Sequence, residues 1–535
     1  MLTHGDADDP TASSSPSSAA PLHPTPTQRA ELGRHARSRA SRGTLGDWTP
    51  RPGRPDPVAT VRGQEVDRVQ ELLPIRRSRM AESPFAFYRG AAAVMADDLG
   101  AVGGPANSGI IVQLCGDAHL SNFGLFASPD RSLVFDINDF DETHIGPFEW
   151  DVARLAASFW IAAEQAGIRT KDVPTITRRA VETYRVSMGE FANMNELDVW
   201  YSRIDADSLT TWANSSGDQA HARAVARVLK SATERDRWSA VRSLTERTLD
   251  GPVFANRPPL LVRLPNTGSW DTMVTDTYRA FLSTLLPDRA MLLSRYLPID
   301  FGHKVVGVGS VGLRALVLLL QGRDENDLLV LQAKQAVHSV LAPFTPTEGL
   351  THMGERVVRG QRLMQAATDP LLGWATGPAG THYYVRQIRD MKWSPDIAKL
   401  SFANFLSYAA ICGQALARAH ARAGDAIAIS AYLGTSSRFD KALVEFAHAY
   451  SVQTTADHAA FAAYARSCGD GGTLDARAES TAIERSLQHA FDGGRFVTGS
   501  AGGIPATLSP TQTAALVEPV DVREANAASE GNEET

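Results

Sequence analysis

Residues 115–143 read CGDAHLSNFGLFASPDRSLVFDINDFDET, the densest group of polar side chains beside strand-forming sequence in the chain. Those able to do chemistry are Asp117, His119, Asn122, Asp136, Asp139, Asp141 and Glu142. The Ser-Pro-Asp-Arg turn between two apolar runs predicts a hairpin, which lets carboxylates and an amide converge on one point. Such oxygen ligands suit Mg²⁺ better than zinc. An acidic turn with a capping Asp is the alternative interpretation.

The spacing of three residues favours a metal site. Asp117 and Asn122 are five residues apart, as in the kinase loop H-R-D-x-x-x-x-N, where the Asp receives the acceptor proton and the Asn holds metal. Asp136 follows Asn122 by fourteen residues, after two short strands, where kinases carry a metal-binding Asp. We therefore predict Asn122 and Asp136 as metal ligands. Asp139 is either a further ligand or a carboxylate at the edge of the site.

Three motifs resemble aminoglycoside and choline phosphotransferases. They are Gly-Asp-x-His-x-x-Asn at 116–122, Phe-Asp-x-x-Asp at 135–139, and GPFEWDVARL at 146–155. The resemblance implies that Asp117 is the catalytic residue and that Asp151 supports the catalytic loop, whereas the alternative for Asp151 is a helix N-cap. Cys115 departs from the pattern, because these enzymes usually carry His there.

A second motif, GVGSVG, occupies residues 307–312. Alone it also fits a dinucleotide-binding turn, which opens directly into a helix. Here an apolar run at 314–320 predicts a strand instead, as in the glycine-rich hairpin that covers ATP phosphates in kinases. The residues predicted to contact the nucleotide in this loop are Gly307, Gly309, Ser310 and Gly312.

Lys334 ends the next predicted strand, 328–333, and is one of only seven lysines among 53 basic residues. A lysine there is predicted to pair with the α- and β-phosphates of ATP. The alternative is a lysine that extends along the protein surface from a strand end. Glu355, on a predicted helix at 351–367, is the expected ion-pair partner of Lys334.

The order of these parts is inverted relative to kinases, because the glycine motif follows the acidic segment by about 190 residues. The strand predicted at 383–388 would enter the hinge, and the helix at 401–423 would be the long helix that leads into the catalytic loop elsewhere. We predict an α+β, bilobal, protein-kinase-like fold in circularly permuted order, with a large helical lobe and a small β-rich lobe.

Further motifs resemble the bacterial domain of unknown function 2252 family, over about residues 60–465. They are Arg79-Met80 with the run 83–90, the segment 115–143, the run 306–312 and the run 360–365. That resemblance implies no established activity.

Composition divides the chain. The predicted parts are a disordered arm at 1–55, a catalytic-loop segment and helical lobe at 56–296, a β-rich nucleotide-binding lobe at 297–395, a helical completion at 396–495 and a disordered acidic tail at 496–535. Both ends carry few large apolar residues that could offset the entropy of ordering. The helical block 150–295 is expected to shape the acceptor pocket.

The bulk composition excludes several classes of protein. The chain has 535 residues, 43% hydrophobic and 21% charged, with a net charge of −7. This predicts a soluble protein without nucleic-acid or membrane partners. Three scattered cysteines indicate neither a disulfide framework nor a zinc site, and the N-terminus lacks a secretory layout. We expect a cytoplasmic location, and the sequence leaves the oligomeric state open.

Together these patterns predict an ATP- and Mg²⁺-dependent phosphotransferase acting on a hydroxyl of a small-molecule acceptor. Two alternatives remain, a non-catalytic nucleotide-binding regulator and a metal-dependent phosphohydrolase. Arg89 reaches a phosphate or forms a structural salt bridge.

Overall fold

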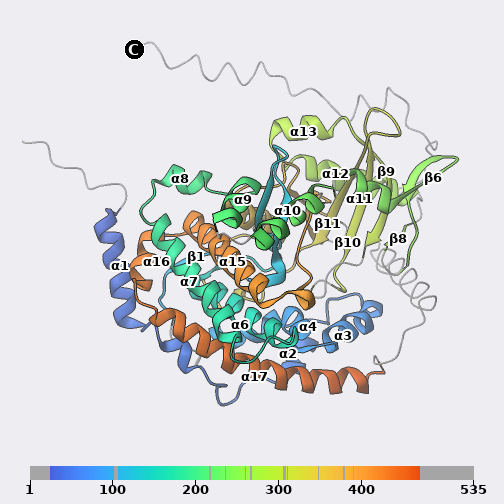
Figure 1. The fold of residues 1–535 in the computed structure, drawn as a ribbon. Coiled ribbons are helices and arrows are strands. Elements are labelled where there is room, and N and C mark those ends of the chain that lie inside the picture. Colours follow the sequence, from blue (N-terminus) through green and yellow to red (C-terminus); the bar gives the residue numbers. More distant parts are fainter. Residues whose placement is uncertain are drawn as a thin grey trace, which may run out of the picture.

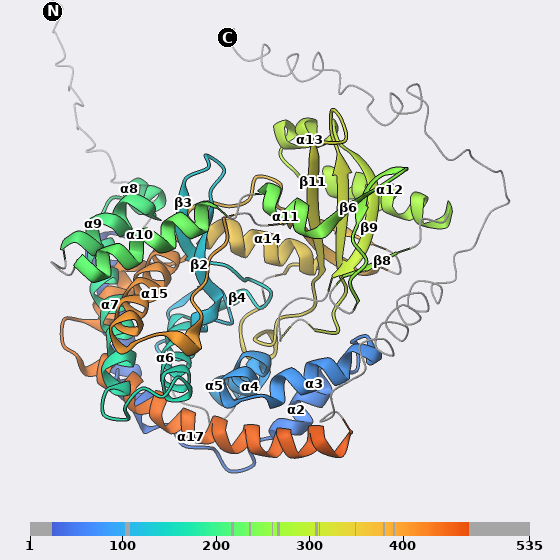
Figure 2. The same cartoon turned by 45° about the vertical axis from the view of Figure 1, so that its right-hand side comes forward.

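The computed structural model describes residues 24–469, except for ten short segments. The omitted segments are 102–106, 216–218, 235–236, 259–260, 265–267, 305–308, 310, 348, 378–379 and 389–390. A six-stranded sheet stands beside a larger body of helices (Figures 1 and 2). The predicted α+β class is therefore confirmed.

The six-stranded sheet has the strand order β12-β13-β11-β10-β9-β8, and every neighbouring pair is antiparallel. The strands are β8 (Leu261–Arg263), β9 (Leu297–Lys304), β10 (Ala315–Gln321), β11 (Leu328–Gln335), β12 (Gly373–Thr376) and β13 (His382–Gln387). Lys334 lies opposite Ala315 on one side and Tyr384 on the other. The predicted strands at 314–320, 328–333 and 383–388 are confirmed, and Lys334 occupies the interior of the sheet.

Strand alternation directs the two faces of this sheet toward different coverings. One face packs on α12 (Gly268–Leu282) and α13 (Pro287–Leu293), where Leu320 and Leu331 are buried with Phe281. The other face carries Val330, Gln332 and Lys334 at alternate positions of β11. Its far part is covered by α11 (Arg237–Leu244) and the hairpin β6 (Thr245–Thr248) and β7 (Gly251–Phe254), whose Phe254 is buried with Val330.

The acidic segment, residues 115–143, is enclosed between two strands that pair with each other. β1 (Ile111–Leu114) pairs with β4 (His144–Pro147), and Leu114 lies opposite His144. Between them the chain forms the predicted hairpin of β2 (Phe123–Ala127) and β3 (Leu133–Ile137), to which the short strand β5 (Ile204–Asp205) adds. Strands β1 and β3 therefore belong to different sheets.

Helices form the rest of the described chain. They are α1 (Pro26–Arg39), α2 (Pro57–Gly63), α3 (Leu73–Ala81), α4 (Pro84–Gly90), α5 (Ala92–Gly100), α6 (Phe148–Gln165), α7 (Val173–Phe191), α8 (Glu196–Tyr201), α9 (Ala206–Ser215), α10 (Gln219–Thr233), α14 (Met353–Met364), α15 (Phe402–Ala423), α16 (Ala426–Leu433) and α17 (Arg438–Ser467). The helices predicted at 351–367 and 401–423 are confirmed as α14 and α15. The Ser83 hydroxyl accepts from the Ala86 amide and caps α4.

α6 is the central helix of the helical body. Its first sixteen residues, 148–163, are all buried, as expected for a helix with neighbours on every side. It contacts α4, α7, α15 and α17. None of the described helices combines the length and the apolar character needed to cross a membrane.

The prediction of a disordered arm at 1–55 is wrong for its second half. Residues 24–55 are described, and α1 lies along α16 (Figure 1). Arginines that composition alone assigns to a solvated tail have specific partners here. Arg42 donates to the Leu433 carbonyl at the end of α16, and Arg54 bridges Asp98 of α5 and Asp457 of α17. Ion pairing and helix capping order this segment together with the burial of Leu45 and Trp48 in the main core. Residues 1–23 and the predicted tail at 496–535 lie outside the described residues.

The Arg54 bridge provides a stability test. Its side chain is 9% exposed, and its partners Asp98 and Asp457 are 2% and 6% exposed. We expect Arg54→Gln to lower the free energy of unfolding by about 3 kcal/mol, because two buried carboxylates lose their shared cation. Urea denaturation measures this. The matched control Arg169→Gln, whose side chain is 71% exposed and pairs with Asp172 three residues away, should change stability by less than about 0.5 kcal/mol. Equal effects of both substitutions would contradict the ordered arm.

Candidate functional site

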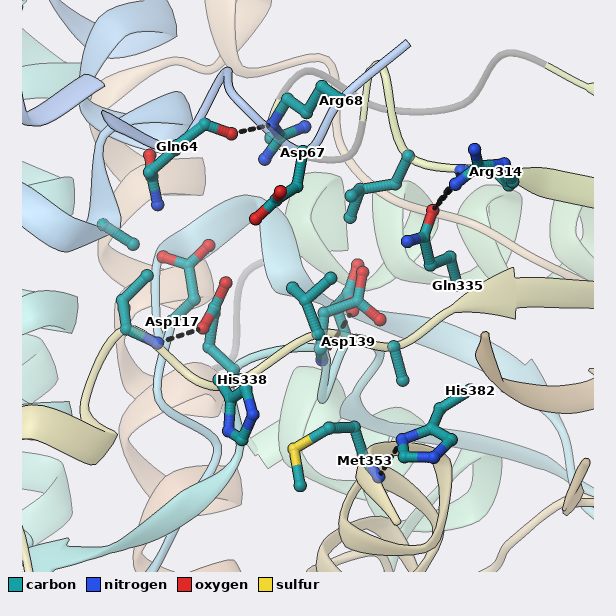
Figure 3. A pocket seen from close by; sticks show the side chains of 18 of the residues that line it. Gln64, Asp67, Arg68, Asp117, Asp139, Arg314, Gln335, His338, Met353 and His382 are labelled. Atoms are coloured by element: carbon teal, nitrogen blue, oxygen red, sulfur yellow. Dashed lines mark hydrogen bonds between the residues drawn. The ribbon is translucent and has the colours of Figure 1, made fainter. Parts of the chain in front are cut away.

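A polar cavity of about 720 Å³ lies where the acidic segment meets the sheet and the N-terminal helices (Figure 3). Its wall combines parts of the chain far apart in sequence: 64–92, 117–142, 309–314, 335–340, 353 and 380–382. Among the predicted site residues, Asp117, Asn122, Asp139 and Gly309 line the cavity. None of its lining residues comes from the block 150–295, so the helices at 64–92 supply the wall expected from that block.

Lys334 joins the sheet to the acidic segment. Its Nζ lies 2.7 Å from Asp141 Oδ2 and 3.8 Å from Asp139 Oδ2. Tyr384, its neighbour on β13, donates its hydroxyl to Asp141 Oδ1 at 2.5 Å. Burial opposes the charged form of Lys334, but the carboxylates of Asp139 and Asp141 outweigh it and raise the pKa of the lysine. The ammonium is therefore permanently charged and ion-paired.

Glu355 does not pair with Lys334, and that prediction is wrong. The Glu355 carboxylate accepts from Arg359 one turn later on the same helix. The next residue, Arg356, is the one that α14 directs into the protein. Its guanidinium donates to the backbone carbonyls of Asp141, Thr143 and Val337. Helix α14 thus fixes the backbone of the acidic segment rather than the lysine side chain, because Arg356 and not Glu355 lies on its inner face.

Asp117 lines the cavity, and a buried arginine holds its carboxylate in place. Arg154 of α6 donates to Asp117 Oδ1 through Nε at 2.8 Å and Nη2 at 2.7 Å. The other oxygen, Oδ2, is 3.5 Å from His119 Nε2. Burial lowers the pKa of His119 to about 4, so this imidazole is neutral at pH 7. Asn122 Nδ2 donates to the Asp117 carbonyl at 2.9 Å, which fixes the two residues relative to each other.

Asp151 supports the loop that carries Asp117, as the phosphotransferase resemblance implies. Its two oxygens accept from the backbone amides of Cys115 and Gly116 at 2.8 and 3.1 Å. It lies inside α6 and does not cap that helix. His420 of α15 lies 3.2 Å from Asp151. Gly116 has a φ of +82°, and a Cβ there would meet the Glu142 carbonyl, so this turn requires glycine.

Asp136 does not face the cavity. It is fully buried, and Arg418 of α15 donates to its Oδ1 at 2.7 Å. The backbone amides of Ile137 and Ala366 also donate to its carboxylate, to Oδ1 at 2.8 Å and to Oδ2 at 2.9 Å. Asp136 lies within β3, and its side chain points into the interior between α14 and α15. The geometry therefore does not fit the predicted role as a metal ligand.

Asn122 and Asp139 do reach the cavity, where they present an amide and a carboxylate. The Asp139 side chain is 36% exposed. Among the described residues, no three His, Cys, Asp or Glu side chains stand close enough to hold a metal ion. A site of this kind lacks a complete protein cage. A divalent cation at this place would need further ligands from water or from a bound molecule.

The described part of the glycine motif closes the cavity from the sheet side. Gly309 lines the wall, and Gly312 follows it with its carbonyl accepting from the Val69 amide at 2.9 Å. The segment is therefore attached to the N-terminal helices as well as to the sheet. Gly307 and Ser310, also predicted to contact the nucleotide, lie outside the described residues.

Glu142, a residue of the acidic segment to which the sequence assigned no role, also lines the cavity. Burial is the largest influence and raises its pKa to about 7, although the Val340 amide and Arg356 favour the ionised form. Sequence reasoning also overlooked Arg154, Arg356, Arg418 and His420. Each is a long or aromatic polar side chain on the buried face of a helix. Their partners are 19 to 282 residues distant, so no local pattern identifies them.

The family model of DUF2252, described as an uncharacterized protein conserved in bacteria, matches residues 68–464. The chain belongs to this family, which confirms the resemblance seen in the sequence. No curated protein and no solved structure matches the chain. The matched range contains the whole cavity wall except Gln64 and Asp67.

The two neighbouring carboxylates Asp136 and Asp139 should differ in their effect on stability. Asp136→Ala leaves Arg418 buried without its counter-ion, and we expect a loss of about 3 kcal/mol or more. Asp139→Ala removes a partly exposed group while Lys334 keeps Asp141, so the loss should stay below about 1 kcal/mol. Chemical denaturation of both variants measures this. A larger loss for Asp139→Ala would contradict the assigned environments.

Glu142 predicts a pH dependence of stability. Its folded-state pKa of about 7 lies above the ordinary value of 4.5, so the folded state binds the proton more tightly. Its contribution is fully present below pH 4.5 and is lost as pH rises through 7. Glu142→Gln keeps the acceptor oxygen and removes the titration. Relative to wild type, the variant should gain of the order of 2 kcal/mol between pH 5 and pH 8, as followed by thermal unfolding. A pH-independent difference would refute the shift.

Proposed function

We propose that this protein transfers the γ-phosphoryl group of ATP to a hydroxyl of a small molecule, with Mg²⁺ bound alongside the nucleotide. One observation carries the proposal: Lys334, which follows the glycine motif, contacts Asp141 and Asp139 of a segment that precedes it by 193 residues. Two motifs with separate kinase resemblances thus meet at one cavity. A lysine after a glycine hairpin and an Asp/Asn loop are the parts that such transfer requires.

The fold that we propose is a kinase-like arrangement in circularly permuted order. In the usual order, a long helix leads directly into the catalytic loop. Here α15 contacts β1, the strand that leads to Asp117. His420, near the end of α15, also binds the Asp151 that supports this loop. These contacts support a chain whose ends were exchanged without moving the site, as tolerated when the old termini lie close together.

Asp117 is the residue we assign to proton transfer. Arg154 holds Oδ1, which leaves Oδ2 toward the cavity beside a neutral His119. The acceptor hydroxyl oxygen forms the new bond to the γ-phosphorus, ADP leaves with the electron pair of the broken bond, and the hydroxyl proton passes to Asp117. Positioning of this kind contributes about 10²- to 10⁴-fold in rate.

The metal would be held by Asn122 and Asp139, the two predicted ligands that the cavity exposes. When bound, Mg²⁺ supplies charge neutralisation of the phosphate oxygens. Asp141 lies beside them and keeps Lys334 extended toward the site through the 2.7 Å contact. Asp136 acts indirectly, because its pair with Arg418 fixes the end of β3 from which Asp139 projects.

Calorimetry with MgATP and an assay of ATP consumption with hydroxyl compounds test the proposal. Wild type should bind MgATP in the submillimolar range, and Asp139→Asn or Lys334→Met should weaken binding at least tenfold. Asp117→Asn should keep binding and lower transfer by about 10²- to 10⁴-fold. The control is Asp130→Asn, at the exposed tip of the hairpin, where the side chain is 58% exposed.

Three outcomes separate the possibilities. Loss of binding in both the Asp139 and Lys334 variants, with transfer dependent on Asp117, supports the kinase assignment. If wild type binds MgATP but neither it nor any variant consumes ATP, a nucleotide-binding regulator replaces the kinase assignment. A wild type that ignores millimolar MgATP would refute the proposed function.

A further inference from the structure

Three arginines from separate parts of the chain line the cavity. Arg68 lies between α2 and η2 (Gln70–Leu72), Arg89 lies in α4, and Arg314 immediately precedes β10. Figure 3 shows Arg68 and Arg314 on the same side of the cavity as the exposed carboxylate Asp67. The sequence predictions did not include Arg68 or Arg314.

Arg89 is the arginine of the three whose buried donor group lacks a hydrogen-bond acceptor. Its Nε is buried, and its guanidinium has no hydrogen bond or ion pair to any residue that the structure describes. The head group stands 5.9 Å from the centre of the Phe85 ring. Burial lowers its pKa, while the carboxylates of Asp117 and Asp139 oppose that shift from across the cavity. A buried donor without an acceptor is costly, and a ligand oxygen would remove this cost.

Arg68 is held in place by backbone contacts. Its Nε donates to the Gln64 carbonyl at 3.1 Å and its Nη1 to the Val311 carbonyl at 2.5 Å. Gly312 has a φ of +92°, and a Cβ there would touch the Arg68 side chain at 3.0 Å. No described residue accepts from the remaining Nη2. The guanidinium is thus rigidly placed against the glycine motif with donor capacity to spare.

Arg314 also retains donors. Its single side-chain hydrogen bond in the described structure is a long one, 3.4 Å from Nη1 to Gln335 Oε1. It has no ion-pair partner among those residues.

The carboxylates of the cavity do not neutralise these arginines. Asp117 is bound by Arg154, and Asp141 is bound by Lys334 and Tyr384. Glu142 accepts from the Val340 amide, and its raised pKa leaves it partly protonated near neutrality. Asp139 lies 3.8 Å from Lys334, and Asp67 is exposed on the same side as Arg68 and Arg314. Within the described structure no ion pair joins a cavity carboxylate to any of the three arginines, so their spare donors remain available to an anion.

We infer that Arg68, Arg89 and Arg314 form a phosphate-binding subsite. Planar guanidinium groups bind phosphate oxygens through paired hydrogen bonds, and three of them suit a multiply charged phosphate group. The phosphate is either the phosphate chain of a nucleotide or a phosphate group on the acceptor. The subsite does not depend on phosphoryl transfer, because it requires binding alone.

Calorimetry with tripolyphosphate and inorganic phosphate, without Mg²⁺, tests the subsite. Wild type should bind tripolyphosphate, and Arg89→Gln should weaken binding at least tenfold. Arg89→Lys, which keeps the charge but loses the paired geometry, should give an intermediate affinity. The matched control is Arg359→Gln, on α14 with a side chain 64% exposed and paired to Glu355, which should change affinity less than twofold. Failure of wild type to bind, or equal losses in the Arg89 and Arg359 variants, would overturn the inference.

Folding of each variant is checked by thermal unfolding. If Arg89→Gln does not fold, Arg314→Gln at the strand end replaces it, with the same tenfold expectation. A folded Arg314→Gln that binds tripolyphosphate like wild type would then overturn the subsite.

Competition with MgATP distinguishes the two sources of phosphate. If MgATP displaces tripolyphosphate and both weaken together in Arg89→Gln, the subsite holds the nucleotide phosphate chain. If inorganic phosphate still binds to MgATP-saturated protein and only that binding depends on Arg89, the subsite holds an acceptor phosphate. Arg89-dependent phosphate binding in a protein that ignores MgATP would support the subsite while refuting the proposed kinase function.

Discussion

The buried contact between Lys334 and the carboxylates of Asp141 and Asp139 is the interaction on which the site depends. It joins the middle of the six-stranded sheet to a segment enclosed between β1 and β4. Charges this deeply placed require good geometry and further hydrogen bonds. Tyr384 donates one such hydrogen bond to Asp141, and Arg356 donates to the backbone carbonyls of Asp141 and Thr143. Because these partners belong to β11, β13 and α14, moving any one of these elements would disturb the cavity.

The acidic segment carries one carboxylate that is structural and another that faces the cavity. Asp136 and Asp139 are three residues apart, yet one is fully buried against Arg418 and the other reaches the cavity. The change occurs where β3 ends at Ile137. Within the strand the side chain of Asp136 must take an alternating direction set by the pleat. Beyond the strand end the backbone is free to turn Asp139 toward Lys334. The structural carboxylate thus anchors the segment, and the exposed one is left for chemistry.

The family assignment and the proposed function stand on different observations. The match over residues 68–464 places the chain in DUF2252. The phosphotransferase proposal instead rests on the meeting of the glycine motif and the Asp117 loop at one cavity, and on the ion pair of the buried Lys334 with Asp141 of the cavity wall. The cavity also has a wall that the kinase comparison did not anticipate, formed by α2 to α5 and their connections. That wall contributes Arg68 and Arg89, and it attaches to the glycine motif through Val69 and Gly312.

The sequence by itself determined the secondary structure around the site and the residue types of its chemistry. Turn residues, the Ser83 cap and apolar periodicity are local signals, and β10, β11, β13, α14 and α15 follow them. Only the tertiary structure decided which charged groups meet. Lys334 pairs with Asp141 and not with Glu355, because the packing of α14 directs Arg356 rather than Glu355 into the protein. The arm at 24–55 is ordered by arginine partners more than 40 residues away and by the burial of Leu45 and Trp48 against the helical body, and composition carries no record of such distant contacts.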